Sequence, residues 1–192
     1  MSMIIMVPNE TLRLVAKPVD RLDKRVLNIV KDMIKTLKEA KNPKGVGLAA
    51  SQIGAGLRIF LIRPIKNGPI TVFINPEITH YSQRTTHPTA KKGVYEGCLS
   101  IPNHYAPLER SSSVTVKYQT LTTSPLTPLQ NFGEGNARGK VVEKTQVFSG
   151  FPAHVIQHEM DHLNGILFID RCLEQNAKLY KSDGDRWQEI TL

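Results

Sequence analysis

The sequence predicts one domain in which helices and several β-strands share a single core. A chain of 192 residues with 40% hydrophobic residues is long enough for one ordinary core and short for two. Apolar residues recur at helical spacing over residues 22–40 and again over 152–164, and short β-rich runs lie between these stretches. No internal repeat or linker divides the chain, so we expect a single domain over residues 1–192.

The first helical stretch, residues 22–40, is expected to form an amphipathic helix near the N-terminus. Asp20 and Asp23 are its candidate N-caps, and Asn42-Pro43 favours its end. Its apolar positions follow three- and four-residue spacings, and they are Leu22, Val26, Ile29, Val30, Met33, Leu37 and Ala40.

Several runs have strand composition and alternate with turn residues. The expected strands are residues 58–63, 70–74, 77–81, 113–118 and 141–148. Residues 119–139 are rich in Thr, Pro and Gly and have no periodic pattern, so we expect a long exposed loop there. The tail from Cys172 onward is at best weakly helical in its pattern.

The second helix, expected over residues 152–164, carries the most informative motif. Pro152 suits the first turn of this helix and Gly165 suits its left-handed end. Within it, residues 158–162 have the sequence His-Glu-Met-Asp-His. Apolar residues surround these polar ones, which indicates a buried helix.

In a helix, His158 and His162 lie one turn apart, so both imidazoles project from one face toward a shared ion. Glu159 points about 100° away, so it can act as general acid/base on a metal-activated water without being a ligand. The alternative is a core helix with hydrogen-bonded histidines. Burying these groups together with Asp161 and no metal would need many compensating partners, so the motif favours a metal-dependent hydrolase.

An open catalytic metal site needs a third protein ligand. Phe168 stands where a metzincin protease has its third His, which excludes that class. Glu174 or Glu189 is a candidate for the downstream Glu of a thermolysin-like protease, although neither follows a helical pattern. Cys98 is the better candidate, because the preceding Gly97 lets the backbone approach a ligand closely and a thiolate suits Zn²⁺ or Fe²⁺.

Charge and cysteine content give weaker indications. The net charge of +8 favours an acidic partner such as nucleic acid, but without a binding motif a solvated surface explains it better. The two cysteines are too few for a disulfide framework, which favours a reducing, cytoplasmic setting. No apolar run approaches the roughly 18 residues of a membrane span, and the first residues lack the pattern of a signal peptide.

Three short motifs follow one another along the chain. They are Gly-Val-Gly-Leu-Ala-Ala-Ser-Gln at residues 45–52, Glu-Gly-Cys-Leu-Ser at 96–100 and Gln-His-Glu-Met-Asp-His-Leu-Asn-Gly at 157–165. Together they make the chain resemble a known family, the peptide deformylases. The segments 12–19 and 73–77 extend the resemblance over most of the chain. It implies an α+β fold in which small antiparallel β-sheets pack around the central HExxH helix. The expected activity is removal of the formyl group from the N-terminal formylmethionine of newly made polypeptides.

The resemblance also implies a ligand set and partners. Cys98, His158 and His162 are expected to bind one divalent metal ion, Fe²⁺ first, with Zn²⁺, Ni²⁺ or Co²⁺ able to occupy the same position. N-formylmethionyl nascent peptides are the expected substrates, and the ribosome is a plausible partner. Neither a membrane nor a specific nucleic-acid sequence is expected. The expected location is the cytoplasm, and the mature form of an organellar enzyme would have a similar sequence.

The resemblance assigns two further groups of residues. The catalytic residues are Glu159 as general acid/base, with the Gln52 side-chain amide and the Leu99 backbone N–H as donors to the oxyanion. The substrate-binding residues are Gly45, Val46, Gly47, Gly97 and His154. The first three are expected to pair with an extended peptide as a sheet edge, and His154 to line the methionine pocket.

The same resemblance expects Glu96 and Arg110 to form a supporting ion pair, and it carries over no role for Tyr105. Two alternatives stay open beside a deformylase. One is a zinc endopeptidase with a downstream Glu ligand, and the other is a catalytically silent relative that binds peptides or ribosomes.

Overall fold

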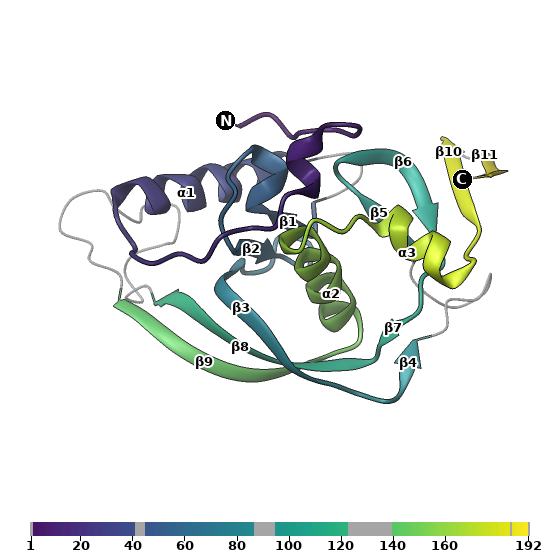
Figure 1. The fold of residues 1–192 in the computed structure, drawn as a ribbon. Coiled ribbons are helices and arrows are strands. Elements are labelled where there is room, and N and C mark those ends of the chain that lie inside the picture. The colour runs from purple at the N-terminus through teal and green to yellow at the C-terminus, as the bar shows by residue number, and fades with distance from the viewer. Residues whose placement is uncertain (1, 41–44, 87–94, 123–139, 185, 192) are drawn as a thin grey trace.

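The structure, a computed structural model, describes residues 2–40, 45–86, 95–122, 140–184 and 186–191 (Figure 1). Its helices are η1 (Glu10–Arg13), α1 (Lys24–Glu39), η2 (Ala50–Ile53), α2 (Phe151–Leu163) and α3 (Phe168–Gln175). Its strands are β1 (Gly47–Ala49), β2 (Ile59–Ile62), β3 (Thr71–Tyr81), β4 (Thr85–Thr86), β5 (Glu96–Cys98), β6 (Ile101–Ala106), β7 (Arg110–Ser111), β8 (Ser113–Thr122), β9 (Lys140–Ser149), β10 (Leu179–Asp183) and β11 (Arg186–Ile190).

Helix α1 confirms the predicted N-terminal amphipathic helix. Of the two candidate caps, Asp23 is the one used, because its carboxylate accepts a hydrogen bond of 2.9 Å from the backbone N–H of Val26. The buried face of α1 packs with residues of β1 and β2, including Leu48 and Leu61, in one hydrophobic cluster. The predicted stop at Asn42-Pro43 lies outside the described residues.

The larger sheet is antiparallel and has the strand order β1-β2-β3-β8-β9. The runs 70–74 and 77–81, expected as two strands, belong to the single strand β3, whose register shifts between Ile74 and Glu77. Pro76 has no N–H to donate to the neighbouring strand at this point, so the ladder is interrupted while the strand continues. Sheet pairing therefore joins two runs that local composition separates.

The expected loop at residues 119–139 begins later than predicted. Strand β8 continues to Thr122 and pairs with β9 along its whole length, so residues 119–122 are strand. Backbone pairing across the hairpin stabilises these residues, although their composition has no clear strand pattern. The remainder of the expected loop, 123–139, lies outside the described residues.

The smaller sheets have the orders β11-β10-β6-β5 and β4-β7. The expectation of an at most weakly helical tail is wrong, because the C-terminal residues form α3 and then the β10–β11 hairpin. Helix α3 buries Phe168 and Cys172, and β10 pairs Tyr180 with Tyr105 of β6. Both interactions are tertiary, so the local sequence pattern did not indicate them.

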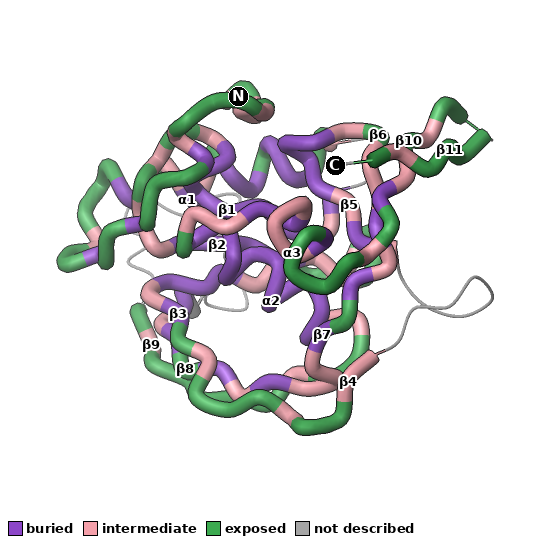
Figure 2. The backbone as a smooth tube through the Cα atoms, turned by 45° about the vertical axis from the view of Figure 1, so that its right-hand side comes forward, coloured by how far each residue is buried: buried purple, intermediate pink, exposed green. Residues whose placement is uncertain are grey.

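Helix α2 lies in the middle of the molecule, with the larger sheet on one side and the β5–β6 strands on the other (Figure 1). The expected helix 152–164 is confirmed to within one residue at each end. Figure 2 shows buried residues gathered on α2 and β2, and exposed ones along β9 and β11. On one side of α2, Val155 and Ile156 pack in a cluster with Phe60 and Phe73.

This arrangement confirms the expected α+β class with small antiparallel sheets around the HExxH helix. Among the described helices, none has the length and hydrophobicity that crossing a bilayer requires.

Candidate metal centre and active site

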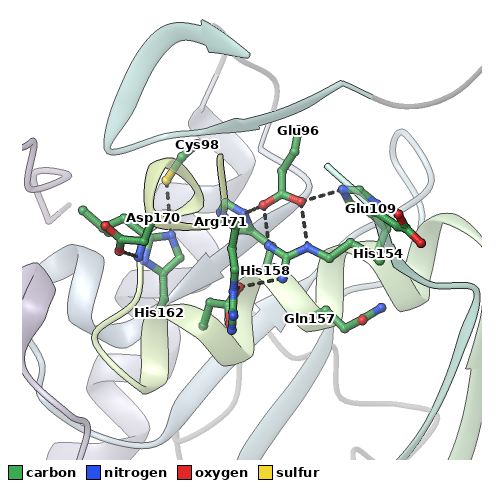
Figure 3. Close-up of polar contacts among 12 residues, drawn as sticks. Glu96, Cys98, Glu109, His154, Gln157, His158, His162, Asp170 and Arg171 are labelled. Carbon is green, nitrogen blue, oxygen red and sulfur yellow. Dashed lines mark hydrogen bonds and ion pairs between the residues drawn. The ribbon is translucent and has the colours of Figure 1, made fainter. Parts of the chain in front are cut away.

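The structure brings together the three side chains that the sequence suggests as metal ligands. Cys98 ends strand β5, and His158 and His162 project from one face of α2. Their candidate ligand atoms all lie within 4.8 Å of one another, and all three residues are buried. Figure 3 shows the Cys98 sulfur pointing at the His162 ring, with 3.2 Å between Sγ and Nε2.

Two N–H groups point at the Cys98 sulfur. The backbone N–H of Ser100 lies 3.4 Å from Sγ, and the side-chain amide nitrogen of Gln52 lies 3.5 Å from it. The same amide nitrogen donates to the Ser100 hydroxyl at 3.1 Å, while the Gln52 carbonyl accepts from the backbone N–H of Ala49 at 2.9 Å. Gln52 therefore caps the backbone at η2 and also directs a donor into the cluster.

Glu96 links the histidines of α2 to the rest of the fold. Its Oε1 lies 2.7 Å from His158 Nδ1, and its Oε2 lies 2.8 Å from His154 Nε2 (Figure 3). Arg110 donates to both carboxylate oxygens, at 3.0 and 2.7 Å, which confirms the expected ion pair. Arg110 also donates to Asp161 at 2.6 Å. A carboxylate on Nδ1 orients an imidazole and leaves its Nε2 free to act as a ligand.

The electrostatic environment of the cluster favours a cation. Burial raises the pKa of Glu96, but the positive charges of Arg110 and His158 outweigh burial and hold this pKa well below its ordinary value. Burial lowers the pKa of His158, yet Glu96 and Cys98 beside it raise this pKa well above its ordinary value. Burial and the neighbouring His158 lower the pKa of His162, which keeps its imidazole neutral. The cluster thus combines the neutral imidazole of His162 with the position of His158, where the neighbouring Glu96 and Cys98 favour positive charge.

Glu159 is buried beside the cluster, and its Oε2 has no hydrogen-bond partner among the residues that the structure describes. Burial raises the pKa of this carboxyl to about 7. The carboxylate lies directly against Gly47 of β1, where an added Cβ would be 2.1 Å from Oε1. Any side chain at Gly47 would displace the carboxylate, so this glycine makes room for Glu159.

The other glycines of the motifs also have neighbours within the chain. A Cβ on Gly45 would lie 2.6 Å from the backbone oxygen of Leu37, at the end of α1. A Cβ on Gly97 would lie 2.8 Å from the ring of Tyr105. We expected these glycines to bring the backbone close to a peptide or ligand. In the structure, the lack of a side chain at each of them also avoids a clash with a neighbouring residue.

A cavity of about 150 Å³ opens beside Glu159. Of the expected site residues, it is lined by Val46, Gly47, Gln52, Gly97, Leu99, His154, His158 and Glu159. Gly45, Cys98 and His162 are not among the lining residues.

Four further lining residues were given no role from the sequence: Tyr95, Tyr105, Phe151 and Val155. Val155 and Phe151 lie three and seven positions before His158, so they share its face of α2. Helical spacing could therefore have identified these two. The two tyrosines lie outside any helix and have no comparable signal.

Comparison with known proteins decides among the classes that this geometry allows. The sequence model of a family described as polypeptide deformylase matches residues 1–129 and 136–178. The chain belongs to the polypeptide deformylase family. Members of this family are metal-dependent hydrolases, and their reaction removes the N-formyl group from nascent polypeptides. The resemblance seen in the sequence is thereby confirmed, and the endopeptidase alternative is not supported.

Individual deformylases match over most of their length. The peptide deformylase of Pseudothermotoga lettingae is 39% identical over 159 residues, which are 83% of this chain and 75% of that protein. The crystal structure of the Thermotoga maritima deformylase superposes with a TM-score of 0.69 at 35% identity, covering 89% of this chain and 97% of that one. A Synechococcus elongatus deformylase, solved in complex with actinonin, gives 0.69 at 33% identity, with 91% of this chain and 82% of that one covered.

Proposed function

We propose that deformylation takes place in the cavity beside Glu159 and that Cys98, His158 and His162 hold the metal ion it requires. The observation that carries this proposal is the cluster of their ligand atoms within 4.8 Å, in a family of metal-dependent deformylases. One thiolate and two imidazoles leave a fourth position open, as a catalytic site requires. Glu96 on His158 Nδ1 is the supporting contact that orients a metal-binding imidazole.

The donor set fits Fe²⁺ and Zn²⁺ equally well, since thiolate and imidazole suit both ions. We propose Fe²⁺ as the ion in the cell, with Zn²⁺, Ni²⁺ or Co²⁺ able to replace it. When bound, the ion supplies a Lewis acid that polarises the formyl carbonyl and makes a water molecule more acidic.

Glu159 is the proposed proton carrier of the reaction. Its carboxylate accepts the proton of the attacking water and then returns it to the leaving amine of the methionine. Burial, which raises the pKa of this carboxyl, suits both steps, because a general acid/base works best when its pKa lies nearer the working pH than that of an exposed carboxyl. Its Oε2, which accepts no hydrogen bond within the described part of the chain, leaves one oxygen available for this exchange.

Gln52 and Leu99 are the proposed donors to the oxyanion that develops on the formyl oxygen. The Gln52 amide group already points into the cluster, because its nitrogen lies 3.5 Å from the Cys98 sulfur. Its carbonyl is fixed by the Ala49 N–H, so the amide is oriented before substrate binds. Leu99 lines the same cavity, and its backbone N–H is the second proposed donor.

The substrate is proposed to bind as an extra strand. In the larger sheet β1 is an edge strand, which pairs with β2 on one side. We propose that an extended peptide pairs with the backbone of Gly47 and of Gly45 and Val46, which lead into β1. Such pairing is independent of the peptide's sequence. Val46, Gly97 and His154 line the cavity that would receive the methionine side chain.

The test is formate release from formyl-Met-Ala-Ser by protein loaded with Fe²⁺ under anaerobic conditions. We expect turnover of this peptide and none of acetyl-Met-Ala-Ser, whose additional methyl group the formyl position would have to accommodate. Protein with full metal occupancy that releases no formate would contradict the proposal and favour a catalytically silent relative.

We further propose that the enzyme works in the cytoplasm on chains emerging from the ribosome. The net charge of +8 supports association with the ribosome's anionic surface, and the two free cysteines support a reducing compartment. The measurement is co-sedimentation with ribosomes at low salt, where we expect binding that weakens as salt is raised. Protein that stays in the supernatant at low salt would contradict the ribosome proposal.

A further inference from the structure

Aromatic rings continue outward from the cavity along one face of the sheet β11-β10-β6-β5. Tyr95 and Tyr105 line the cavity itself. Trp187 of β11 stacks on Tyr105, with 4.9 Å between ring centroids and an angle of 24° between the planes, and meets Tyr95 edge-on at 5.3 Å. Tyr180 of β10 adds a fourth ring, 5.8 Å from Tyr95. We refer to Tyr95, Tyr105, Tyr180 and Trp187 as the aromatic face.

Strand register places these rings together. Tyr105 of β6 pairs with Gly97 of β5 and with Tyr180 of β10, and directly paired residues project from the same face of a sheet. Trp187 pairs with Ser182, two residues from Tyr180, so it projects from this face as well. Because Gly97 has no side chain, the Tyr105 ring can lie over β5 at Gly97, the residue next to Cys98.

The outermost ring of the aromatic face is only partly covered. Trp187 is 48% exposed, although it stacks on a residue that lines the cavity. An exposed aromatic surface that is continuous with a binding cavity is typical of an extended ligand site.

The size of the cavity indicates what reaches this surface. An apolar cavity of about 150 Å³ holds a molecule of the size of benzene, so this one is matched to a single side chain. The residues that follow the methionine must then lie outside the cavity. An extended chain advances about 3.3 Å per residue, so the next one or two side chains are close enough to contact Tyr105, which lines the cavity, and Trp187, which stacks on it.

We propose that Tyr105 and Trp187 bind the side chain of the first or second residue after the formylmethionine, and that the enzyme prefers an aromatic residue there. This inference rests on the proposed function, because it extends the same substrate site. A ring pair of this kind corresponds to a preference of about threefold to tenfold in kcat/KM.

The experiment compares matched peptides that differ by one side chain. The pairs are formyl-Met-Phe-Ser with formyl-Met-Gly-Ser, and formyl-Met-Ser-Phe with formyl-Met-Ser-Gly. We expect the Phe peptide of at least one pair to have the higher kcat/KM, through a lower KM. In Trp187→Ala and Trp187→Leu, the ratio of kcat/KM for the Phe peptide to kcat/KM for the matching Gly peptide should fall to about one. Tyr81→Ala, which removes an exposed ring on β3 that does not line this cavity, is the matched control and should keep the preference.

A second measurement needs no variant, because Trp187 is the single tryptophan of the chain. Its fluorescence should change when the deformylated product Met-Phe-Ser or Met-Ser-Phe is added, and change less with the matching Gly peptide. This signal comes directly from the proposed surface, so it does not depend on how well a Trp187 variant folds.

The outcomes separate this inference from the proposed function. Turnover of all four peptides with equal kcat/KM would overturn the inference and leave the deformylase function standing. Equal losses for Phe and Gly peptides in both Trp187 variants would also overturn it, because Trp187 would then only stabilise the hairpin. A dimer that dissociates in Trp187→Ala, without any Phe preference, would assign the aromatic face to a second copy of the chain. Release of formate from none of the peptides would contradict both proposals.

Discussion

The proposed substrate site has two ends that are built in different ways. At the inner end, Glu96, Arg110 and Asp161 are buried and joined by hydrogen bonds of 2.6 to 3.0 Å. At the outer end, Tyr105 and Trp187 are held by ring contacts, and Trp187 is half exposed. The inner end fixes atoms for chemistry that is the same for every substrate, whereas the outer end meets a part of the peptide that differs between substrates.

The energetic consequence of this difference is large. Removing one partner of a buried ion pair costs about 3–5 kcal/mol, because a charge is left unpaired away from water. Exposed pairs contribute about 0–1 kcal/mol, because water screens them. Substitutions at the inner end should therefore remove function or stability, and those at the outer end should change selectivity. Four predictions test this contrast.

The largest effect is expected for Cys98→Ala. Loss of the thiolate removes one of three proposed ligands, so the metal content should fall from about one ion per chain to almost none, and activity with it. Metal analysis and formate release measure the two effects. Cys172→Ala is the matched control, because this cysteine is also buried but lies in α3. A Cys98→Ala protein that keeps both metal and activity would show that Cys98 is not a ligand.

Glu159→Gln should leave the metal in place and lower kcat by about 10²–10⁴-fold, the usual contribution of a general acid/base. The amide has nearly the shape of the carboxylate, so it still fits against Gly47, but it cannot accept the proton. The experiment measures kcat and metal content in the same preparation. Glu143→Gln, at an exposed position in β9, serves as the control and should behave as wild type. Normal turnover by Glu159→Gln would remove Glu159 from the mechanism.

Glu96→Gln tests the support behind His158. A neutral amide orients the imidazole less strongly and leaves Arg110 with one charged partner, so metal affinity should fall about 10–100-fold. Competition with a chelator measures this affinity. An unchanged affinity would mean that α2 alone holds His158 in place.

The smallest effect is expected at the outer hairpin. Lys178, just before β10, and Glu189 of β11 form an exposed ion pair of 2.8 Å. Because water screens this pair, Lys178→Ala should change the free energy of unfolding only marginally, as measured by urea denaturation, and should leave deformylation of formyl-Met-Ala-Ser unchanged. A loss as large as that expected for a buried pair would show that the outer end is as tightly coupled as the inner one.

The proposed metal ligands beside the inner end were largely predictable from the sequence, because short-range spacing brings the two histidines together. Two histidines one turn apart place both imidazoles on one face of a helix, and the apolar residues around them predict that the helix is buried. Cys98 followed from the need for a third ligand and from Gly97 before it. The helix bounds and the clustering of all three side chains agree with that prediction.

The outer end was not predictable, because contacts between distant segments determine it. Trp187 meets Tyr105 only after β10 has paired with β6, and no local pattern in the tail indicates that pairing. The reasons for Gly45 and Gly47 were hidden in the same way. Gly45 is required by the end of α1 and Gly47 by the Glu159 carboxylate. Both contacts exist only in the folded chain.

The contact between Gly47 and Glu159 bears on how the enzyme could become resistant to an inhibitor. A compound that pairs with the backbone of β1 and reaches Glu159 would touch main-chain atoms, a glycine and the proton carrier. Adding even one methyl group at Gly47 would push the carboxylate aside, since the Cβ would be 2.1 Å from Oε1, so a resistant variant there would lose its own activity. Substitutions of Tyr105 or Trp187, which take no part in the proposed chemistry, would not carry this loss. Inhibitors that do not contact the aromatic face would therefore be less easily evaded by mutations that preserve activity.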